Sequence, residues 1–216
     1  MKLSKQTLAI LKNFSMINQS IVIKPGSKLE TISNVKDVFA DATIEEIFDK
    51  QVSIYDLNEL LGVISLFEDP EISLEDSYLL LTQGKTSQKY YYADASIITC
   101  PPDKGVTLPS EEINLSIDRN TLSMIVRAAA INNASDLTFT NNGITVHDKA
   151  VPNSNMFTVE TPQTNDTYNL SISVDKLKMV PDDYEIAICS KGLAKFTGNY
   201  INYFVALQPE GSYEKG

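Results

Sequence analysis

The residues capable of acid–base, metal or phosphate chemistry are scattered along this chain rather than placed at productive spacings. The single histidine, His147, has Asp148 beside it, but no nucleophile or further ligand is spaced to join them. Adjacent carboxylates such as Glu45–Glu46 and Asp182–Asp183 are too common to indicate acid–base work. Lys191–Gly192 lacks the glycine-rich context of a phosphate loop. The sequence therefore predicts no catalytic residue, no metal site and no cofactor.

The charged residues that do form a pattern are lysines near the start of the chain. The 216 residues carry a formal charge of -10. Residues 1–28 nevertheless hold five lysines and no acid, so the remaining residues sum to -15. The five are Lys2, Lys5, Lys12, Lys24 and Lys28. Because lysines neutralise phosphates, one basic segment in an acidic protein indicates a polyanionic partner that meets only that segment.

Residues 4–18 have the spacing of an amphipathic helix. Its inward stripe has three- and four-residue spacing and consists of Leu3, Thr7, Ile10, Phe14 and Ile17. The opposite side holds Lys2, Lys5, Ala9 and Lys12. The water-facing side of this helix is therefore predicted to be purely cationic.

A second amphipathic helix is predicted from Asp118 as N-cap to about Asn132. Its inward residues are Leu122, Ile125 and Ala129. Arg127 lies on the opposite face and Arg119 at its margin, and only Asp118 supplies an acid. For either helix alone, an ordinary solvated surface explains the charges. Two matching cationic faces in an acidic chain instead favour one positive surface that binds the phosphates of a nucleic acid without recognising its base sequence.

The chain is predicted to have an α+β fold of two tandem domains, each an antiparallel sheet with helices on one face. Residues 99–111 contain three prolines and a glycine and are typical of a connector between residues 1–98 and 112–216. Two dipeptide pairs support a duplication at a shift of 114 residues. They are Thr7–Leu8 with Thr121–Leu122, and Ile17–Asn18 with Ile131–Asn132.

Short strands fill both halves of the chain. Strands are expected at 20–24, 29–33, 37–43, 71–74, 78–82, 88–93, 113–117, 137–140, 144–147, 184–190, 194–197 and 203–207. Asn141-Asn142-Gly143 is a hairpin signal, Asp56 caps a predicted helix, and a short helix is expected near 175–179.

The compartment is predicted to be the cytosol. Residues 1–5 lack the apolar core and cleavage site of a signal peptide, and no stretch approaches the ~18 apolar residues that a membrane helix needs. Cys100 and Cys189 need not form a disulfide, and Cys189 lies in an apolar run typical of a buried thiol. No membrane partner is expected.

Short motifs along the whole chain carry a family resemblance. In the first half they are Met1–Lys5, Leu11–Phe14, Ile17–Asn18, Ile54–Asn58, Leu61–Gly62 and Ser65–Leu66. In the second half they are Lys178–Met179, Pro181, Tyr184, Lys195–Phe196, Gly198, Asn202–Tyr203 and Val205–Leu207. Together they resemble the T-even-type bacteriophage DNA polymerase sliding clamp family. Residues 67–110 and 133–165 are similar to the family only in pattern.

The resemblance implies a non-enzymatic processivity factor. Three subunits with two clamp-type domains each would form a ring around double-stranded DNA and tether the replicative polymerase in the infected bacterial cytoplasm. An ATP-driven clamp loader would load the ring, and transcription factors would be further partners. The DNA-facing residues would be Lys5, Lys12, Arg119 and Arg127, with Lys2, Lys176 and Lys178 as weaker candidates.

The resemblance also implies a subunit interface and a partner-peptide pocket. The interface would join an edge strand containing Tyr90, Tyr91 and Tyr92 to one containing Met156, Phe157, Thr158 and Val159 of the next subunit. Simple alternation between core and surface is the other explanation for the tyrosines. The pocket for polymerase and loader peptides would include Phe39, Val106, Leu108, Pro109, Val205, Leu207 and Pro209.

Two other classes of protein remain open at this point. One is a phage structural or assembly β-protein that joins through tyrosine-rich edges and never touches DNA. The other is a hydrolase that uses scattered carboxylates. A trimer retained on circular but not linear DNA would indicate the clamp.

Overall fold

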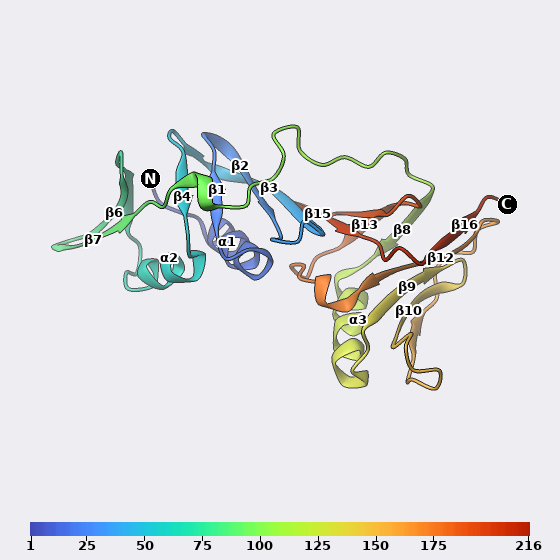
Figure 1. Ribbon diagram of the computed structural model, residues 1–216. Helices are drawn as coiled ribbons and strands as arrows, with labels where there is room; N and C mark the ends of the chain where they lie inside the picture. Colours follow the sequence, from blue (N-terminus) through green and yellow to red (C-terminus); the bar gives the residue numbers. More distant parts are fainter. The chain divides into compact units, whose positions relative to one another are not determined.

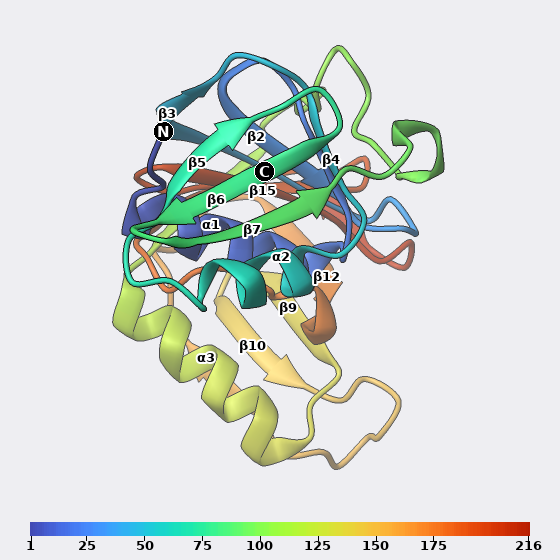
Figure 2. The same ribbon diagram turned by 90° about the vertical axis from the view of Figure 1, so that its left-hand side faces the viewer.

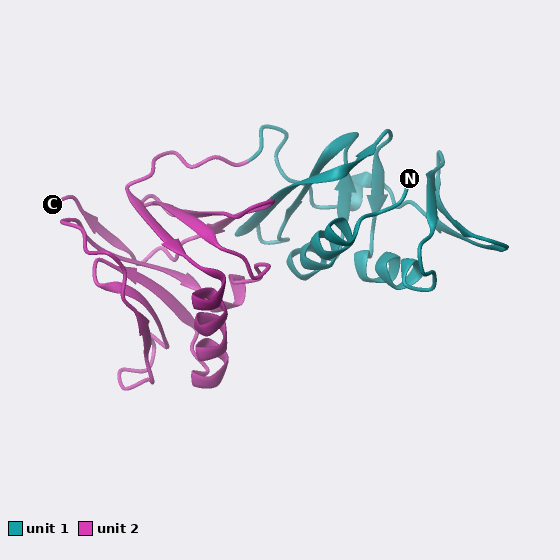
Figure 3. Cartoon of the chain, turned by 180° about the vertical axis from the view of Figure 1, so that it is seen from behind, with its two compact units in different colours: residues 1–105 teal, residues 106–216 magenta.

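The computed structural model describes all 216 residues and divides them into two compact units, Met1–Gly105 and Val106–Gly216 (Figure 3). The division lies between Gly105 and Val106, within the proline-containing segment 99–111. None of the helices combines the length and the apolar composition that a membrane span requires.

Unit 1 contains two helices and seven strands (Figure 1). In chain order they are α1 (Lys5–Ile17), β1 (Ile21–Ile23), β2 (Gly26–Ile32), β3 (Val38–Phe48), β4 (Val52–Ile54), α2 (Leu57–Ile64), β5 (Glu71–Leu74), β6 (Tyr78–Gln83) and β7 (Thr86–Tyr91), followed by the 3-10 turn η1 (Ala95–Ile97). All pairs are antiparallel: β1 with β4, β2 with β3, and β5, β6 and β7 in that order. Figure 2 shows the β5–β6–β7 sheet toward the viewer, with α2 beside β7.

The core of unit 1 confirms the predicted inward stripe of the first helix. Ile10, Phe14 and Ile17 are buried, and Leu11 joins them. Burial of apolar area on this scale is the main stabilising term for the unit. The register of α1 is therefore fixed by its apolar side, which leaves its lysine side in solvent.

Unit 2 contains one long helix and nine strands. They are β8 (Ile113–Ile117), α3 (Arg119–Asn132), β9 (Asp136–Thr140), β10 (Gly143–His147), β11 (Phe157–Val159), β12 (Thr167–Ser173), the 3-10 turn η2 (Val174–Lys176), β13 (Tyr184–Cys189), β14 (Leu193–Thr197), β15 (Ile201–Ala206) and β16 (Ser212–Glu214). One sheet has the order β11-β10-β9-β12-β16, and β15-β14-β13-β8 lie side by side in another.

Leu122, Ile125 and Ala129 of α3 are buried as predicted. The thiol of Cys189 is buried as well.

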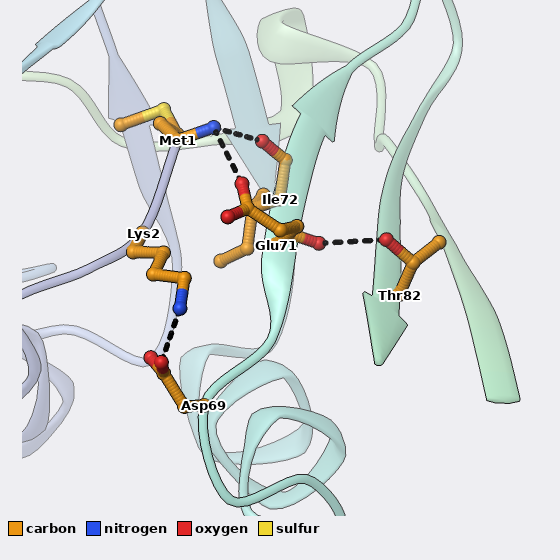
Figure 4. Close-up of polar contacts among 6 residues, drawn as sticks. All are labelled: Met1, Lys2, Asp69, Glu71, Ile72 and Thr82. Atoms are coloured by element: carbon orange, nitrogen blue, oxygen red, sulfur yellow. Dashed lines mark hydrogen bonds and ion pairs between the residues drawn. The ribbon is translucent and has the colours of Figure 1, made fainter. Parts of the chain in front are cut away.

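The two units share more than their order of elements. Ser4 caps α1 and Asp118 caps α3, and these caps are again 114 residues apart. The Met1 nitrogen donates to the Ile72 carbonyl of β5 at 2.7 Å (Figure 4), and the Ile72 N–H donates to the Met1 carbonyl, also at 2.7 Å. Adding 114 gives Leu115 and Ile186, which are register partners between β8 and β13. The structure therefore supports the duplication.

Three predicted features differ in the structure. The helix expected near 175–179 is only the 3-10 turn η2, because Pro181 follows closely and cannot donate a helical hydrogen bond. Strands β4, β12 and β16 were not expected. Ile17 is buried whereas Ile131 is exposed, so this part of the sequence repeat has no counterpart in packing.

The start of α1 is held by a carboxylate from β3. Glu46 accepts hydrogen bonds from the Ser4 backbone N–H and, at 2.5 Å, from the Thr7 hydroxyl. Burial raises the pKa of Glu46, but these hydrogen bonds outweigh it and hold the pKa below its ordinary value. A carboxylate is also favourable at the positive end of a helix. Glu46 therefore fixes where the lysine side of α1 begins.

Replacing a core residue of α1 should destabilise unit 1. Phe14→Ala is expected to lower the free energy of unfolding by about 3–5 kcal/mol, because it removes a fully buried ring and leaves a cavity. Met16→Ala on the same helix, at an exposed position, should cost less than about 1 kcal/mol. Urea unfolding of the two variants measures the difference, and equal losses would contradict the packing of α1.

Replacing Glu46 should destabilise the protein in a pH-dependent way. The folded-state pKa lies below the unfolded value, so the contribution is present at neutral pH and is lost as the pH falls through the folded value. Glu46→Gln should lower stability by roughly 1 kcal/mol at pH 7. The gap to wild type should close in acid. Glu45→Gln, at an exposed site on the same strand, is the control, and a gap independent of pH would contradict the role of the Glu46 charge.

Candidate nucleic-acid interface

The exposed side of α1 carries two cations that have no ion-pair partner. Lys5 and Lys12 are both solvent-exposed, and no carboxylate lies within ion-pair distance of either. They are seven residues apart, which places them on one side of the helix and about 10 Å apart along its axis. Lys12 also borders a hollow between α1 and α2 that Leu61, Glu68 and Asp69 help to line. Both ammonium groups are available to a phosphate backbone.

The other three lysines of residues 1–28 are neutralised within unit 1. Lys2 is bound to Asp69 (Figure 4), Lys24 lies 2.8 Å from Asp103, and Lys28 lies 2.6 Å from Glu30 and 3.3 Å from Asp41. Their hydrogen bonds to these carboxylates raise the pKa of all three lysines above the ordinary value. Lys2 is thus a poorer candidate for DNA contact than Lys5 or Lys12.

The exposed side of α3 carries the two predicted arginines. Arg119 and Arg127 are solvent-exposed, and neither forms an ion pair. They are eight residues apart, about 12 Å along the axis, and differ by about 80° around the helix. Met124, Val126 and Ile131 are exposed on the same helix. The α3 surface therefore combines two charges with apolar side chains and is less uniformly basic than that of α1.

Each helix begins with a cation at its first position. Lys5 follows the Ser4 cap, whose hydroxyl accepts the Thr7 N–H at 3.1 Å. Arg119 follows Asp118, which accepts the Thr121 N–H at 2.7 Å. A helix N-terminus already attracts anions through its partial positive charge. Carboxylates already bind the backbone at both helix starts, Glu46 at α1 and Asp118 with Asp183 at α3, so the exposed cation and not the helix end is left to attract a further anion.

The other two of the three weaker candidates, Lys176 and Lys178, lie near η2. Lys176 is half-buried, and its ammonium donates to the Ala206 carbonyl at 3.4 Å. Lys178 is exposed but has an interaction within the protein. Neither has the unengaged ammonium that Lys5 and Lys12 present.

The tyrosines predicted for the interface alternate along and beyond β7, which is the outer strand of its sheet. Tyr90 is buried and its hydroxyl donates to the Asp56 carbonyl at 3.1 Å, while Tyr91 is 65% exposed. Tyr92 is half-buried, and its hydroxyl has no hydrogen-bond partner. Burial raises the pKa of both Tyr90 and Tyr92 to about 12, so both stay protonated. Of the three tyrosines, only Tyr91 is exposed.

The predicted partner segment also lies at a sheet edge. Phe157–Val159 form β11, which pairs only with β10, and Met156 just before it is 68% exposed. Gly143 allows β11 to approach, because a Cβ there would lie 2.3 Å from the Val159 carbonyl oxygen and the φ of +147° disfavours other residues. Thr158 faces outward and its hydroxyl contacts that of Thr145 at 2.9 Å. β11 is thus a short edge with one unpaired side.

The residues predicted for the peptide pocket have mixed surroundings. Leu207 and Pro209 line a hollow of about 320 Å³ with Leu170, Ser190, Lys191, Gly192, Gln208 and Gly211. Val205 is completely buried and Phe39 nearly so, so neither presents a side chain to a partner. Val106 and Leu108 are half-buried and Pro109 is exposed.

Sequence reasoning missed Glu46 as the anchor of α1 and Lys191 as part of the hollow. Both act through contacts far apart in the chain, so local spacing gave no signal for them. The structure holds no group of three or more His, Cys, Asp or Glu side chains arranged for a metal ion. His147 is half-buried and its Nε2 lies 2.9 Å from the Thr138 hydroxyl.

Comparison with known proteins covers nearly the whole chain. Residues 2–99 match the family model of the DNA polymerase processivity factor, and residues 111–209 match that of the gp45 sliding clamp, C terminal. The sliding clamp of Enterobacteria phage T4 is 31% identical over 228 residues, covering 99% of this chain and 100% of that protein.

Solved structures share the fold at much lower identity. The PCNA2–PCNA3 complex from Sulfolobus tokodaii has a TM-score of 0.70 at 14% identity, covering 97% of this chain and 100% of the other. The A. fulgidus PCNA bound to the C-terminal region of FEN-1 has a TM-score of 0.67 at 15% identity, covering 97% and 99%. Sliding clamps are processivity factors and not enzymes. The chain therefore belongs to the DNA polymerase processivity factor family and is a sliding clamp of the phage type.

Proposed function

We propose that three copies of this chain close into a ring around duplex DNA, with the cations of α1 and α3 toward the duplex. The observation that carries this assignment is the difference among the cations. Lys5, Lys12, Arg119 and Arg127 form no ion pair, whereas Lys2, Lys24 and Lys28 are neutralised by carboxylates. Unpaired cations on helix surfaces attract phosphates and leave base edges unread.

The acidic remainder of the chain supports the same arrangement. A net charge of -10 repels DNA from most of the surface and leaves the cationic faces as the favourable place for it. The few exposed cations would each make only a weak contact with a phosphate. Such contacts permit sliding, and retention on the template then comes from closure of the ring.

Ring closure is assigned to the two edge strands that sequence and family resemblance indicate. Tyr90, Tyr91 and Tyr92 of one subunit would lie against Met156, Phe157, Thr158 and Val159 of the next. Support comes from the positions of β7 and β11 as outer strands of their sheets. An unpaired edge in a protein of this size is a surface that needs a partner or protection.

The hollow at Leu207 and Pro209 is assigned to the replicative polymerase and to an ATP-driven clamp loader. The A. fulgidus PCNA, which shares the fold, is bound by the C-terminal region of FEN-1, and this supports the docking of a partner segment on a protein of this fold. An apolar anchor inserted at this hollow would supply much of the binding energy. Transcription factors would compete for the same place in the infected bacterial cytoplasm.

Retention on DNA should depend on the topology of the DNA. A ring loaded on nicked circular duplex by its clamp loader should stay bound through gel filtration. It should be lost when the same DNA is linearised, because only closure holds it. Equal retention on circular and linear DNA would contradict encirclement.

Charge reversal on α1 should weaken retention and lower its salt dependence. For Lys5→Glu with Lys12→Glu, the slope of log retention against log salt should fall by about one for each phosphate that the variant no longer neutralises. Lys24→Glu with Lys50→Glu makes the same change in net charge at lysines that are already paired with Asp103 and Asp76, so it serves as control. An equal effect of both pairs on retention at fixed salt would contradict the assignment of the α1 face.

A further inference from the structure

A hollow of about 540 Å³ lies between α1 and α2, which pack against each other. One side of each helix faces it: Leu8, Ala9 and Lys12 from α1, and Asn58, Leu61, Gly62 and Ser65 from α2. Relative to Asn58, the other α2 residues follow after three, four and seven positions, which is the spacing of a single helical face. The hollow is therefore a groove with a helix on each side and a length of about 10 Å along α2.

The groove is lined by large apolar side chains that the chain itself covers only in part. Leu3, Leu8, Leu61 and Phe67 all border it and are half-buried. Each of them therefore keeps apolar surface in contact with water, and covering that surface would be favourable. A concave site of this volume with a mainly apolar lining is typical of a ligand-binding site.

Two small residues, Ala9 and Gly62, keep the groove open from opposite sides. Both are exposed and both border the groove. Glycine is a poor helix former, yet Gly62 lies inside α2. A Cβ at Gly62 would meet no heavy atom of the surrounding chain within 4 Å, so packing within the unit does not require glycine there. An occupant of the groove would need the space that these two residues leave.

The two ends of the groove carry opposite charges. Lys12 lies at the end where α2 begins, near the Ser15 hydroxyl, which donates to Asn58 at 2.9 Å. Glu68 borders the groove at the other end, four residues after α2 ends at Ile64. Both Lys12 and Glu68 are exposed, and neither forms an ion pair. An occupant with a carboxylate at one end would therefore find a free ammonium group.

The remaining charged residue of the groove does not alter this difference between the ends. Asp69 borders the groove near Glu68, but it is bound to Lys2, so the pair is neutral (Figure 4). The charges that border the groove without a partner are therefore one cation, Lys12, and one acid, Glu68.

We propose that the groove binds an amphipathic helix of a partner protein, with a carboxylate at the end beside Lys12. A helix laid between two others presents apolar side chains three, four and seven residues apart, a span of about 10 Å that equals the distance from Asn58 to Ser65 along α2. The apolar side of the partner helix would cover Leu61 and Phe67. Its other end would carry no acid, because that end of the groove is itself acidic.

Other occupants match the groove less well. In a second copy of this chain, the exposed apolar residues Met124 and Ile131 share one side of α3 with Arg127, which would bring a like charge to Lys12. A DNA strand would supply a phosphate for Lys12 but no aliphatic surface for Leu61. A helix that combines apolar side chains with one carboxylate satisfies both the apolar lining and the free ammonium group.

Lys12 is shared between this groove and the DNA contact proposed above. One ammonium group cannot pair with a phosphate and with the carboxylate of a partner at the same time, so the partner would bind the clamp that is free of DNA. This consequence rests on the proposed function, whereas binding in the groove rests on the geometry of unit 1.

Filling the groove tests the binding site. The probe is a labelled synthetic peptide with leucines at three- and four-residue spacing, a pair of glutamates near one end and glutamines elsewhere, and fluorescence anisotropy follows its binding to the full chain. Ala9→Leu and Gly62→Leu place a larger side chain in the groove at exposed helical positions and should each weaken binding by at least about tenfold. Ala130→Leu adds the same side chain at an exposed position of α3 and should bind like wild type. Binding that is unchanged in both groove variants would overturn the proposal.

Removing the charge of Lys12 tests the carboxylate contact. A second probe has glutamines in place of the glutamates. At low salt, the wild-type chain should bind the glutamate peptide about tenfold tighter than the glutamine peptide, and Lys12→Met should abolish this preference. Lys5→Met removes the same charge from α1 outside the groove and should keep the preference. A preference that survives Lys12→Met, or that is absent from the wild-type chain, would overturn the assigned contact.

Sedimentation equilibrium without peptide separates a partner helix from a second copy as the occupant. Equal self-association of Ala9→Leu, Gly62→Leu and Ala130→Leu is the expected result. Weaker association of the two groove variants alone would assign the groove to a contact between copies and overturn the proposal. All of these measurements use the chain without DNA, so their failure would remove the groove site and leave encirclement of DNA untouched.

Discussion

The constraint on which the structure depends is that each long helix must bury one side and keep a cation at its N-terminus. Lys5 and Arg119 occupy the first helical positions, where the helix dipole disfavours positive charge. Carboxylates compensate at both places: Glu46 binds the start of α1, and Asp118 caps α3 while Asp183 accepts the Arg119 N–H at 2.7 Å. The local cost is thus offset by acids that bind the backbone and leave the side-chain cations unpaired.

The fold could be predicted from the sequence where the signal is local. Helix α1 follows from its apolar spacing, and the caps at Ser4, Asp56 and Asp118 mark three helix starts. Strand β4 has three residues and is buried throughout, so it shows no alternation, and β16 is equally short and pairs only with the first three residues of β12. Such strands exist because a neighbour completes their hydrogen bonds, which local propensity cannot reveal.

The outward placement of the candidate site residues was predictable to the same extent and for the same reason. Helical geometry alone places Lys5 and Lys12 outward, and the structure agrees. It could not reveal that Lys2 meets Asp69, because 67 residues separate them. Val205 was expected at a partner surface, yet β15 has three consecutive buried residues there, so outward alternation fails at this point. Sequence spacing fixes which side of one element a residue faces, but not what lies across from it.

Weak DNA contacts and a selective subunit contact are physically linked in a protein of this class. Exposed cations each contribute little free energy, and at physiological salt the screening length is about 8 Å, so phosphates can be exchanged rapidly along the duplex. A clamp that bound phosphates tightly would not slide. In the proposed ring, the free energy that retains the clamp would reside in the contact between subunits. Burial there of exposed apolar side chains such as Tyr91 and Met156 is less sensitive to salt than ion pairs are. In the proposed ring, the cations would therefore set mobility on DNA, and the edge strands would set how long the ring stays closed.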